Sequence, residues 1–316
     1  MEISKVKNKK KKPKILRHEL RDTIELALLQ LPGLLHMLIF CYIPMFGVII
    51  AFKKFNPHLG VLGSKWVGFD NFMFFFKSND FFRIMRNTLG YSSMHLILDT
   101  IASLSVAILL YGISKRWVLK IYQTTMILPN FMSAVLIAFV VYAILNPVSG
   151  VLNKVIEIFG GEGKDWYSEA IYWPFILTIV QLWKSVGMKS ILYYAALMGI
   201  DESLFEAARI DGAKRWHEIR YIMIPELMGL ITIQLIMGIG QLVNGDFGLF
   251  YQTPMNVGVL YSTTDIINTY VFRALQESTN MGRTAAVGLF QSVTGATLLI
   301  ISNTIVRKVD PDKSFF

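Results

Sequence analysis

Cysteine is nearly absent from this sequence. The 316 residues contain one cysteine, Cys41, which lies inside an apolar run. A single thiol cannot form a disulfide within one chain, and it cannot supply the cysteine pairs of a structural zinc site. Histidine is also scarce, and the five histidines are scattered along the chain. The sequence therefore excludes a disulfide framework and predicts no metal site.

Motifs for nucleotide binding and catalysis are missing as well. A phosphate-binding loop needs a glycine-rich turn followed by Lys and then by Ser or Thr. The nearest match is the run Gly160-Gly161-Glu162-Gly163-Lys164-Asp165, in which Asp follows the lysine. His217-Glu218 lacks the second histidine that a zinc protease places four residues after the first. We therefore expect no enzyme activity and no cofactor in this chain.

Charged residues are few for a soluble protein. They make up 17% of the chain, whereas hydrophobic residues make up 53%. This composition is typical of a protein that crosses the lipid bilayer several times. Much of the net charge of +9 lies in residues 5–21, which include four consecutive lysines, 9–12. No basic soluble segment with interleaved aromatic residues follows, so we expect a cytoplasmic tail over 1–25 and no nucleic-acid partner.

Six apolar segments are long enough to span a membrane, which requires about 20 residues each. The predicted spans are 31–52, 89–111, 121–145, 171–197, 226–243 and 285–306. Pro44 predicts a kink in the first span, and Pro129 lies inside the third. The first run follows a basic start as in a signal peptide, but it is too long and lacks a small-residue cleavage pattern, so we expect it to be retained. The predicted fold class is an all-α integral membrane protein with one transmembrane domain over 26–309.

The distribution of lysine and arginine predicts the orientation. Basic residues gather in the tail, between the second and third spans, in the loop 198–225 before the fifth span, and directly after the sixth. Placing all four on the cytoplasmic side of the cell membrane puts both termini in the cytoplasm, including the short C-terminal segment 310–316. The exception is the outside segment 53–86, which carries six basic residues and many phenylalanines. We expect helices lying on the membrane surface in this segment. We expect two more helices in the other extracellular loops, at 151–159 and 265–275.

A polar segment separates the fourth and fifth spans. Asp201 can cap a short helix over 202–213, because its side chain accepts a hydrogen bond from a free backbone N–H. Gly212 can end this helix, because glycine tolerates positive φ. Pro225 is predicted at the start of the next span, where its missing N–H costs little. These properties alone are equally typical of an amphipathic helix lying at the membrane surface.

The residues of this segment also resemble a family motif. Glu206-Ala207-Ala208, Asp211-Gly212-Ala213 and Ile224-Pro225 are similar, in type and spacing, to the coupling loop of type I binding-protein-dependent ABC importer permeases. Looser motifs resemble the branch that imports oligosaccharides from polysaccharide breakdown. These motifs are Leu31-Pro32-Gly33, Tyr42-Ile43-Pro44-Met45, Trp66-Val67-Gly68, Asn87-Thr88-Leu89 and Thr269-Tyr270-Val271-Phe272-Arg273.

The resemblance implies a transport subunit that works by alternating access. It implies that the coupling helix docks on a separate ATPase subunit, which holds ATP and magnesium. The implied partners are a second homologous permease, expected to be a paralogue, two ATPase subunits, and an extracellular solute-binding protein that delivers the oligosaccharide. The residues implied to couple transport to the ATPase are Glu206, Ala207, Ala208, Asp211, Gly212 and Pro225.

Other functions compete with this interpretation. The same machine could import amino acids, phosphate or another small solute, because the sugar branch rests on the looser motifs. A self-sufficient secondary transporter would show inverted repeats or broken helices around intramembrane carboxylates. A membrane-embedded enzyme would show clustered His, Asp or Glu near one membrane face. The sequence shows neither pattern convincingly.

Two charges fall near the middle of predicted spans, Asp99 in the second and Lys184 in the fourth. A charge in hydrocarbon is costly unless it is paired or faces water. These residues therefore either form an interhelical ion pair or line the translocation cavity, where a lysine would suit an acidic sugar. The sequence leaves both alternatives open.

Other polar and aromatic residues are candidates for the substrate pathway. Trp183 could pack on the C–H face of a sugar, although helix packing or lipid contact is the simpler role for a tryptophan. Gln234 and Gln241 are seven residues apart and so share a helix face, which Asn244 and Asp246 continue. We interpret this face as a stripe that binds sugar hydroxyl groups, and the alternative is packing between helices.

Overall fold

The computed structural model describes residues 17–278 and 281–315. The described chain is mainly helical, with one two-stranded antiparallel sheet of β1 (Lys53–Lys54) and β2 (Lys65–Trp66). The helical fold class is confirmed, while the lysine run of the predicted tail lies outside the described residues. The α-helices are α1 (Arg17–Met37), α2 (Ile43–Met45), α3 (Gly60–Gly63), α4 (Asp70–Phe76), α5 (Phe81–Tyr111), α6 (Arg116–Ile127), α7 (Ala134–Leu145), α8 (Val151–Ile158), α9 (Trp173–Leu197), α10 (Glu202–Ile210), α11 (Arg215–Glu218), α12 (Ile224–Gly240), α13 (Phe247–Gln252), α14 (Tyr261–Thr264), α15 (Ile267–Ser278) and α16 (Met281–Val309).

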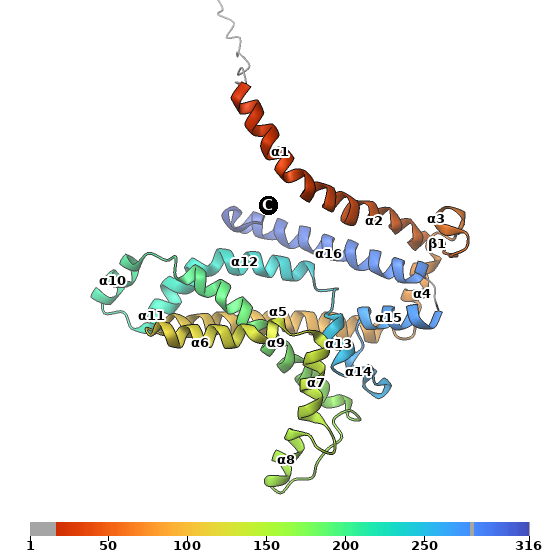
Figure 1. Ribbon diagram of the computed structural model, residues 1–316. Helices are drawn as coiled ribbons and strands as arrows, with labels where there is room; N and C mark the ends of the chain where they lie inside the picture. Colours follow the sequence, from red (N-terminus) through yellow and green to blue (C-terminus); the bar gives the residue numbers. More distant parts are fainter. Residues whose placement is uncertain (1–16, 279–280, 316) are drawn as a thin grey trace, which may run out of the picture.

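Within the described residues, five helical stretches are long and apolar enough to cross a membrane. Figure 1 shows α5, α12 and α16 running along a common direction, and packing contacts join α5 to α9 and α12 to α16. Each stretch overlaps one predicted span, because apolar length is a property of the local sequence. The five stretches are Ile24–Phe52, Phe81–Tyr111, Ala170–Leu197, Arg215–Gly240 and Met281–Val309.

The predicted span 121–145 is broken in the middle. Its two halves, α6 and α7, meet at 103°, so they make a sixth span only if the bent pair is counted as one. Pro129 lies in the 3-10 turn Leu128–Phe131, where the chain leaves the axis of α6. Ser133 then caps α7, because its side chain accepts a hydrogen bond from the N–H of Leu136 at 3.2 Å. The predicted third span is therefore a broken helix, with Pro129 at the break.

Glycine permits α6 to approach α9 just before this break. A Cβ added to Gly187 of α9 would collide with the backbone carbonyl of Met126 in α6. A similar approach joins α16 to α12, where a Cβ on Gly295 would lie 2.5 Å from the carbonyl oxygen of Gly240. Small residues at helix crossings are common in membrane proteins, because they bring two backbones close together.

Two prolines follow π-helical turns inside long helices. The turn Leu38–Tyr42 precedes Pro44, and the turn Ile219–Met223 precedes Pro225. In a regular helix a proline ring collides with the carbonyl four residues earlier, and the wider turn relieves this collision. Helical structure is thus continuous over Arg215–Gly240, and the α-helix α12 begins at Ile224 with Pro225 in its first turn, as the sequence predicts.

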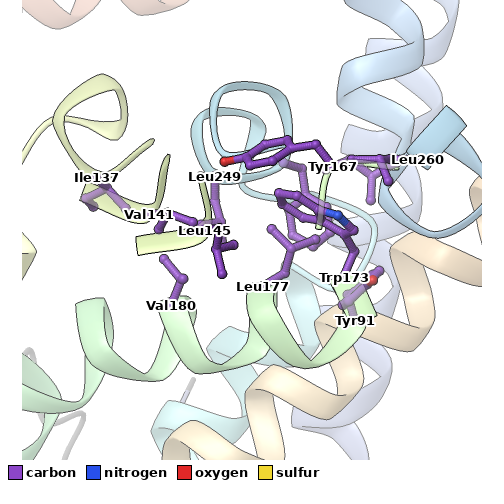
Figure 2. Packing of buried hydrophobic residues seen from close by; sticks show 12 residues of the cluster. Tyr91, Ile137, Val141, Leu145, Tyr167, Trp173, Leu177, Val180, Leu249 and Leu260 are labelled. Carbon is purple, nitrogen blue, oxygen red and sulfur yellow. The ribbon is translucent and has the colours of Figure 1, made fainter. Parts of the chain in front are cut away.

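A buried apolar cluster holds the start of α9 against its neighbours. Figure 2 shows Trp173 and Leu177 of α9 packed with Tyr167 from the preceding loop and with Leu249 of α13. The indole N–H of Trp173 donates a hydrogen bond to the carbonyl of Trp166 at 2.8 Å. Close packing of such side chains holds helices together in membrane proteins. The cluster therefore fixes α13, which borders the polar cavity described below.

Short elements occupy the connections that are predicted to lie outside. The segment 53–86 begins with the β1–β2 hairpin, a feature that the prediction of interfacial helices missed. Helix α3 lies in the loop of this hairpin, and α4 follows β2. Phe52 stacks on Trp66 there, with ring centroids 5.7 Å apart. The helix predicted at 151–159 is confirmed as α8, and the one predicted at 265–275 is α15, which begins two residues later.

A buried carboxylate ties α5 to α15. Asp265 is 1% exposed and accepts hydrogen bonds from Arg83 at 3.2 Å, from Arg273 at 2.6 Å and from the hydroxyl of Thr269 at 2.7 Å. A buried charge is tolerated when ionic and hydrogen-bond partners surround it. Arg83 is one of the six basic residues of the segment 53–86, and this contact gives it a structural role.

Candidate functional site

Helix α10 lies at one end of the long helices, in the connection between α9 and α12 (Figure 1). The carboxylate of Asp201 accepts a hydrogen bond from the N–H of Ser203 at 3.0 Å, and this bond lowers the pKa of Asp201 below its ordinary value. At the other end, Gly212 has φ of +79°, and the N–H of Ala213 donates to the carbonyl of Ala208 at 2.9 Å. The predicted capping by Asp201 and termination at Gly212 are confirmed.

One side of α10 faces the protein and the other side is exposed. Phe205 is 2% exposed and packs into a core cluster with residues of α5 and α12. Glu206, Ala207 and Asp211 are exposed, and Ala208 is half-buried. Small and acidic residues therefore form a surface on this chain that a second protein can reach.

A polar cavity of about 200 Å³ lies between α5, α9 and the end of α12. Polar side chains within apolar spans are costly unless they are paired, face water or meet a ligand. The cavity is thus a place where a hydrophilic solute could contact the spans. Its polar lining includes Ser92, His95 and Asp99 of α5, Gln181 and Lys189 of α9, and Gln241, Asn244 and Asp246 after α12.

Asp99 is a buried carboxylate in the wall of this cavity. It is 2% exposed, and its Oδ1 accepts a hydrogen bond from the hydroxyl of Ser185 at 2.6 Å. Its Oδ2 lies 2.7 Å from Nζ of Lys189, whose side chain is 42% exposed. The ion pair with Lys184, one of the two predicted alternatives, is therefore not formed. Ser185 and Lys189 are four residues apart and share a face of α9, from which Lys184 is turned by roughly 100°.

Lys184 pairs instead with Asp246. Its Nζ lies 2.6 Å from Oδ2 of Asp246, a cavity residue in the connection between α12 and α13. The other carboxylate oxygen of Asp246 accepts a hydrogen bond from the N–H of Leu249 at 3.0 Å and so caps α13. The pair joins α9 to α13, while the Asp99–Lys189 pair joins α5 to α9.

The remaining candidates for the substrate pathway divide into two groups. Gln241 and Asn244 line the cavity, and the side-chain amide of Asn244 donates to that of Gln241 at 2.9 Å. Helix α12 ends at Gly240, so the helix face predicted to join Gln241 to Gln234 is not formed. Gln234 and Trp183 are not among the described residues that line the cavity. The side chain of Trp183 is partly exposed on the surface of the chain.

Comparison with known proteins places these features in a family. The family model for the inner membrane component of binding-protein-dependent transport systems matches residues 99–314, which include α10 and the α9 and α12 sides of the cavity. The chain belongs to this family. The permease is 37% identical over 290 residues to Protein LplB of Bacillus subtilis (strain 168), a match that covers 92% of this chain and 91% of LplB.

A second relative and one solved transporter extend the comparison. The permease is 31% identical over 300 residues to the polygalacturonan/rhamnogalacturonan transport system permease protein YteP of the same organism, covering 95% of this chain and 93% of YteP. Two crystal structures of a bacterial alginate ABC transporter superpose with TM-scores of 0.83 and 0.82, at 29% and 28% identity. The matches cover 94% of the permease and 100% and 98% of the matched chains. One of these structures includes an alginate pentasaccharide-bound periplasmic protein.

Sequence analysis missed the α9 side of the cavity: Gln181 and Lys189 line it, whereas the predicted Lys184 and Trp183 do not. Gln181, Ser185 and Lys189 recur every four residues within an apolar span of the permease, which marks one polar helix face. A search for polar residues of every type in the span 171–197 would have found this stripe. Within the part of the chain that the structure describes, no group of three or more His, Cys, Asp or Glu residues is arranged to hold a metal ion.

Proposed function

We propose that the permease is one transmembrane subunit of an ATP-driven importer of oligosaccharides. The observation that carries this proposal is the exposed surface of α10 around Glu206 and Ala207, at one end of the long helices. The similarity to YteP, whose name refers to polygalacturonan and rhamnogalacturonan, supports an oligosaccharide substrate. The likeness to an importer of the acidic polysaccharide alginate supports an acidic sugar chain as the substrate class.

In this account the permease forms half of the pathway and depends on partner subunits. A second permease, expected to be a homologous paralogue, completes the pathway. The helical stretch Ile24–Phe52 leaves most of its apolar side chains exposed, which suits contact with lipid and with that second permease. Two ATPase subunits hold ATP and magnesium, since this chain has no phosphate-binding loop. An extracellular solute-binding protein delivers the sugar, as the complex of the related alginate transporter supports.

The proposed topology has six spans and both termini in the cytoplasm. It counts α6 and α7 as one bent span and places the coupling loop 198–225 on the cytoplasmic side. The basic residues of that loop and of the connection between α5 and α6 support this orientation.

The proposed mechanism is alternating access. ATP closes the two ATPase subunits, the docked α10 helices move together, and the cavity opens outward to receive the sugar. The ammonium of Lys189 and the amides of Gln241 and Asn244 then offer hydrogen-bond donors to hydroxyl and carboxylate groups. Hydrolysis returns the pathway to the inward-facing state, and no bond in the sugar is broken.

Reconstitution tests this function. The permease pair, the ATPase subunits and the binding protein are placed in proteoliposomes, and uptake of labelled oligogalacturonide is measured with and without ATP. We expect uptake that requires ATP, the ATPases and the binding protein. Uptake driven by an ion gradient through the permease alone would contradict the proposal, and ATP-driven uptake of amino acids in place of the sugar would correct its substrate.

A further inference from the structure

Two side chains on one face of α10 attach this helix to the rest of the permease. Phe205 is buried, and its ring centroid lies 5.9 Å from that of Tyr111 at the end of α5. One turn later, Nε of Arg209 donates a hydrogen bond to Oε1 of Glu218 at 2.8 Å. Residues four apart on a helix face the same way, so both contacts lie on the side of α10 that faces the protein.

Glu218 is a buried carboxylate at the base of the second contact. Its side chain is 5% exposed, whereas that of Arg209 is 57% exposed. The other oxygen, Oε2, accepts a hydrogen bond from Nη1 of Arg215 at 3.0 Å, and the guanidinium of Arg215 lies 5.6 Å from the centroid of the Tyr111 ring. Glu218 therefore connects α10 to the continuous α11–α12 stretch and, through Arg215, to the end of α5.

We propose that the Arg209–Glu218 ion pair is the positioning link that makes α10 turn together with α12. This inference rests on the proposed function, because it requires an ATPase subunit docked on α10. A helix held by the apolar contact of Phe205 alone can pivot about it, because apolar contacts are not directional. A charge-assisted hydrogen bond one turn along is directional and removes this pivot. Movement of the ATPase then reaches α12, whose far end borders the polar cavity.

The geometry separates this link from the local stability of α11. Arg215 and Glu218 are three residues apart, so their ion pair closes within one helical stretch and does not need α10. Removal of Arg209 leaves Glu218 paired with Arg215, and no buried charge is left without a partner. Arg209 can therefore be replaced so that the connection between α10 and α12 is lost while the surroundings of the carboxylate are kept.

Three variants of the whole reconstituted complex test the proposal. We expect Arg209→Met to retain the ATPase subunits and to lower the melting temperature by less than about 4 °C, because the side chain of Arg209 is more than half exposed. The ratio of sugar transported to ATP hydrolysed should fall about five-fold, which is the factor expected when one partly buried ionic hydrogen bond is lost. Arg209→Lys keeps an ammonium within reach of Glu218 and should restore most of this ratio. Arg215→Met is the matched control, because it removes the local pair, keeps the link and should stay close to wild type.

Each other outcome overturns the proposal. An unchanged ratio in Arg209→Met, an equal loss in Arg215→Met, or no rescue by lysine would show that the link does not position α10. If Arg209→Met lost the ATPase subunits, Arg209 would belong to the docking contact, and if its melting temperature fell by much more than about 4 °C, Arg209 would belong to folding. Failure of the wild-type complex to retain ATPase or to transport with ATP would instead refute the proposed function, and it would appear before any substitution is made.

Discussion

Asp99 and Lys184 do not pair with each other, and their positions in the sequence do not identify the partners that they have, Lys189 and Asp246. Two charges at similar depth in two spans suggest a common pair, but the rotation of α9 points Lys189 and Ser185 at Asp99. The same rotation points Lys184 at Asp246. Helix rotation depends on packing against all neighbours, and a one-dimensional pattern does not contain it.

Lys189→Met tests whether the more deeply buried of these two ion pairs contributes more to stability. The substitution leaves Asp99, whose side chain is 3% exposed, without its cation. Loss of one partner of a buried pair destabilises strongly, and the partial exposure of Lys189 reduces the expected loss to about 2 kcal/mol. The measurement is thermal unfolding of the purified permease in detergent.

Lys184→Met is the control for that experiment. The side chain of its partner Asp246 is 34% exposed, so water can solvate the carboxylate when the lysine is removed. We therefore expect a loss of stability below about 1 kcal/mol. Asp99→Asn combined with Lys189→Met should recover stability relative to Lys189→Met alone, because no buried charge remains. Equal losses for the two lysine variants would contradict the burial argument.

Glu206→Lys tests the surface of α10. Glu206 is exposed, so the change should leave the yield and the melting temperature of the permease unaltered. Reversing the charge should, however, prevent the ATPase subunits from being retained during purification and abolish ATP-driven uptake. Glu162→Lys, in the exposed loop before α9, is a matched charge reversal and should retain both. Normal retention in Glu206→Lys would argue against docking at this surface.

At the scale of elements, the crossing of α6 and α9 depends on one glycine. Gly187→Ala places a Cβ against the carbonyl of Met126, so the two helices must separate. We expect a loss of about 2 kcal/mol, the usual cost of overpacking, measured by thermal unfolding.

Gly229→Ala is the matched control for Gly187→Ala. It lies inside α12, and no atom beyond its own helix backbone and chain neighbours is within 4 Å of the added Cβ. Alanine should therefore be tolerated there, with a gain of up to about 1 kcal/mol from helix propensity. Similar losses at the two positions would show that the α6–α9 approach is not tight.

Elements set by local sequence could be predicted, and elements set by packing could not. Apolar length located the spans, and the Asp201 cap with Gly212 located α10, because both signals act within a few residues. Two prolines show the limit of prediction from local sequence. Pro129 lies where a perpendicular helix begins, whereas Pro225 is accommodated inside a continuous helix by a π-helical turn. Proline restricts the backbone in both cases, and the surrounding packing decides which solution forms.

The candidate site could be predicted in part for the same reason. The exposure of Glu206 and Ala207 could be predicted, because it follows from the periodicity of one short helix. The cavity requires three elements to converge, so Lys189, Gln181 and His95 were missed although Asp99 and Asp246 were identified. Polar residues of any type within apolar spans are the signal that would have widened the prediction.

At the scale of the whole molecule, the continuous helical stretch Arg215–Gly240 connects α10 to the polar cavity. The exposed helix α10 lies at one end, while the continuous stretch Arg215–Gly240 leads from it to the residues that border the polar cavity. A movement imposed on α10 can thus alter the cavity without any ATP-binding motif in this chain. This arrangement requires α10 to lie in the cytoplasm and to be covered by another protein.

Cysteine labelling of α10 tests this requirement most directly. Ile210 is 86% exposed, and the chain has a single native cysteine, Cys41, which Cys41→Ala removes. A membrane-impermeant maleimide is applied to Ile210→Cys in this background, in intact cells and in inside-out vesicles, with and without the ATPase subunits. The account predicts labelling only in inside-out vesicles, with protection when the ATPase subunits are present. Labelling from outside the cell, or labelling that the ATPase subunits do not reduce, would contradict it.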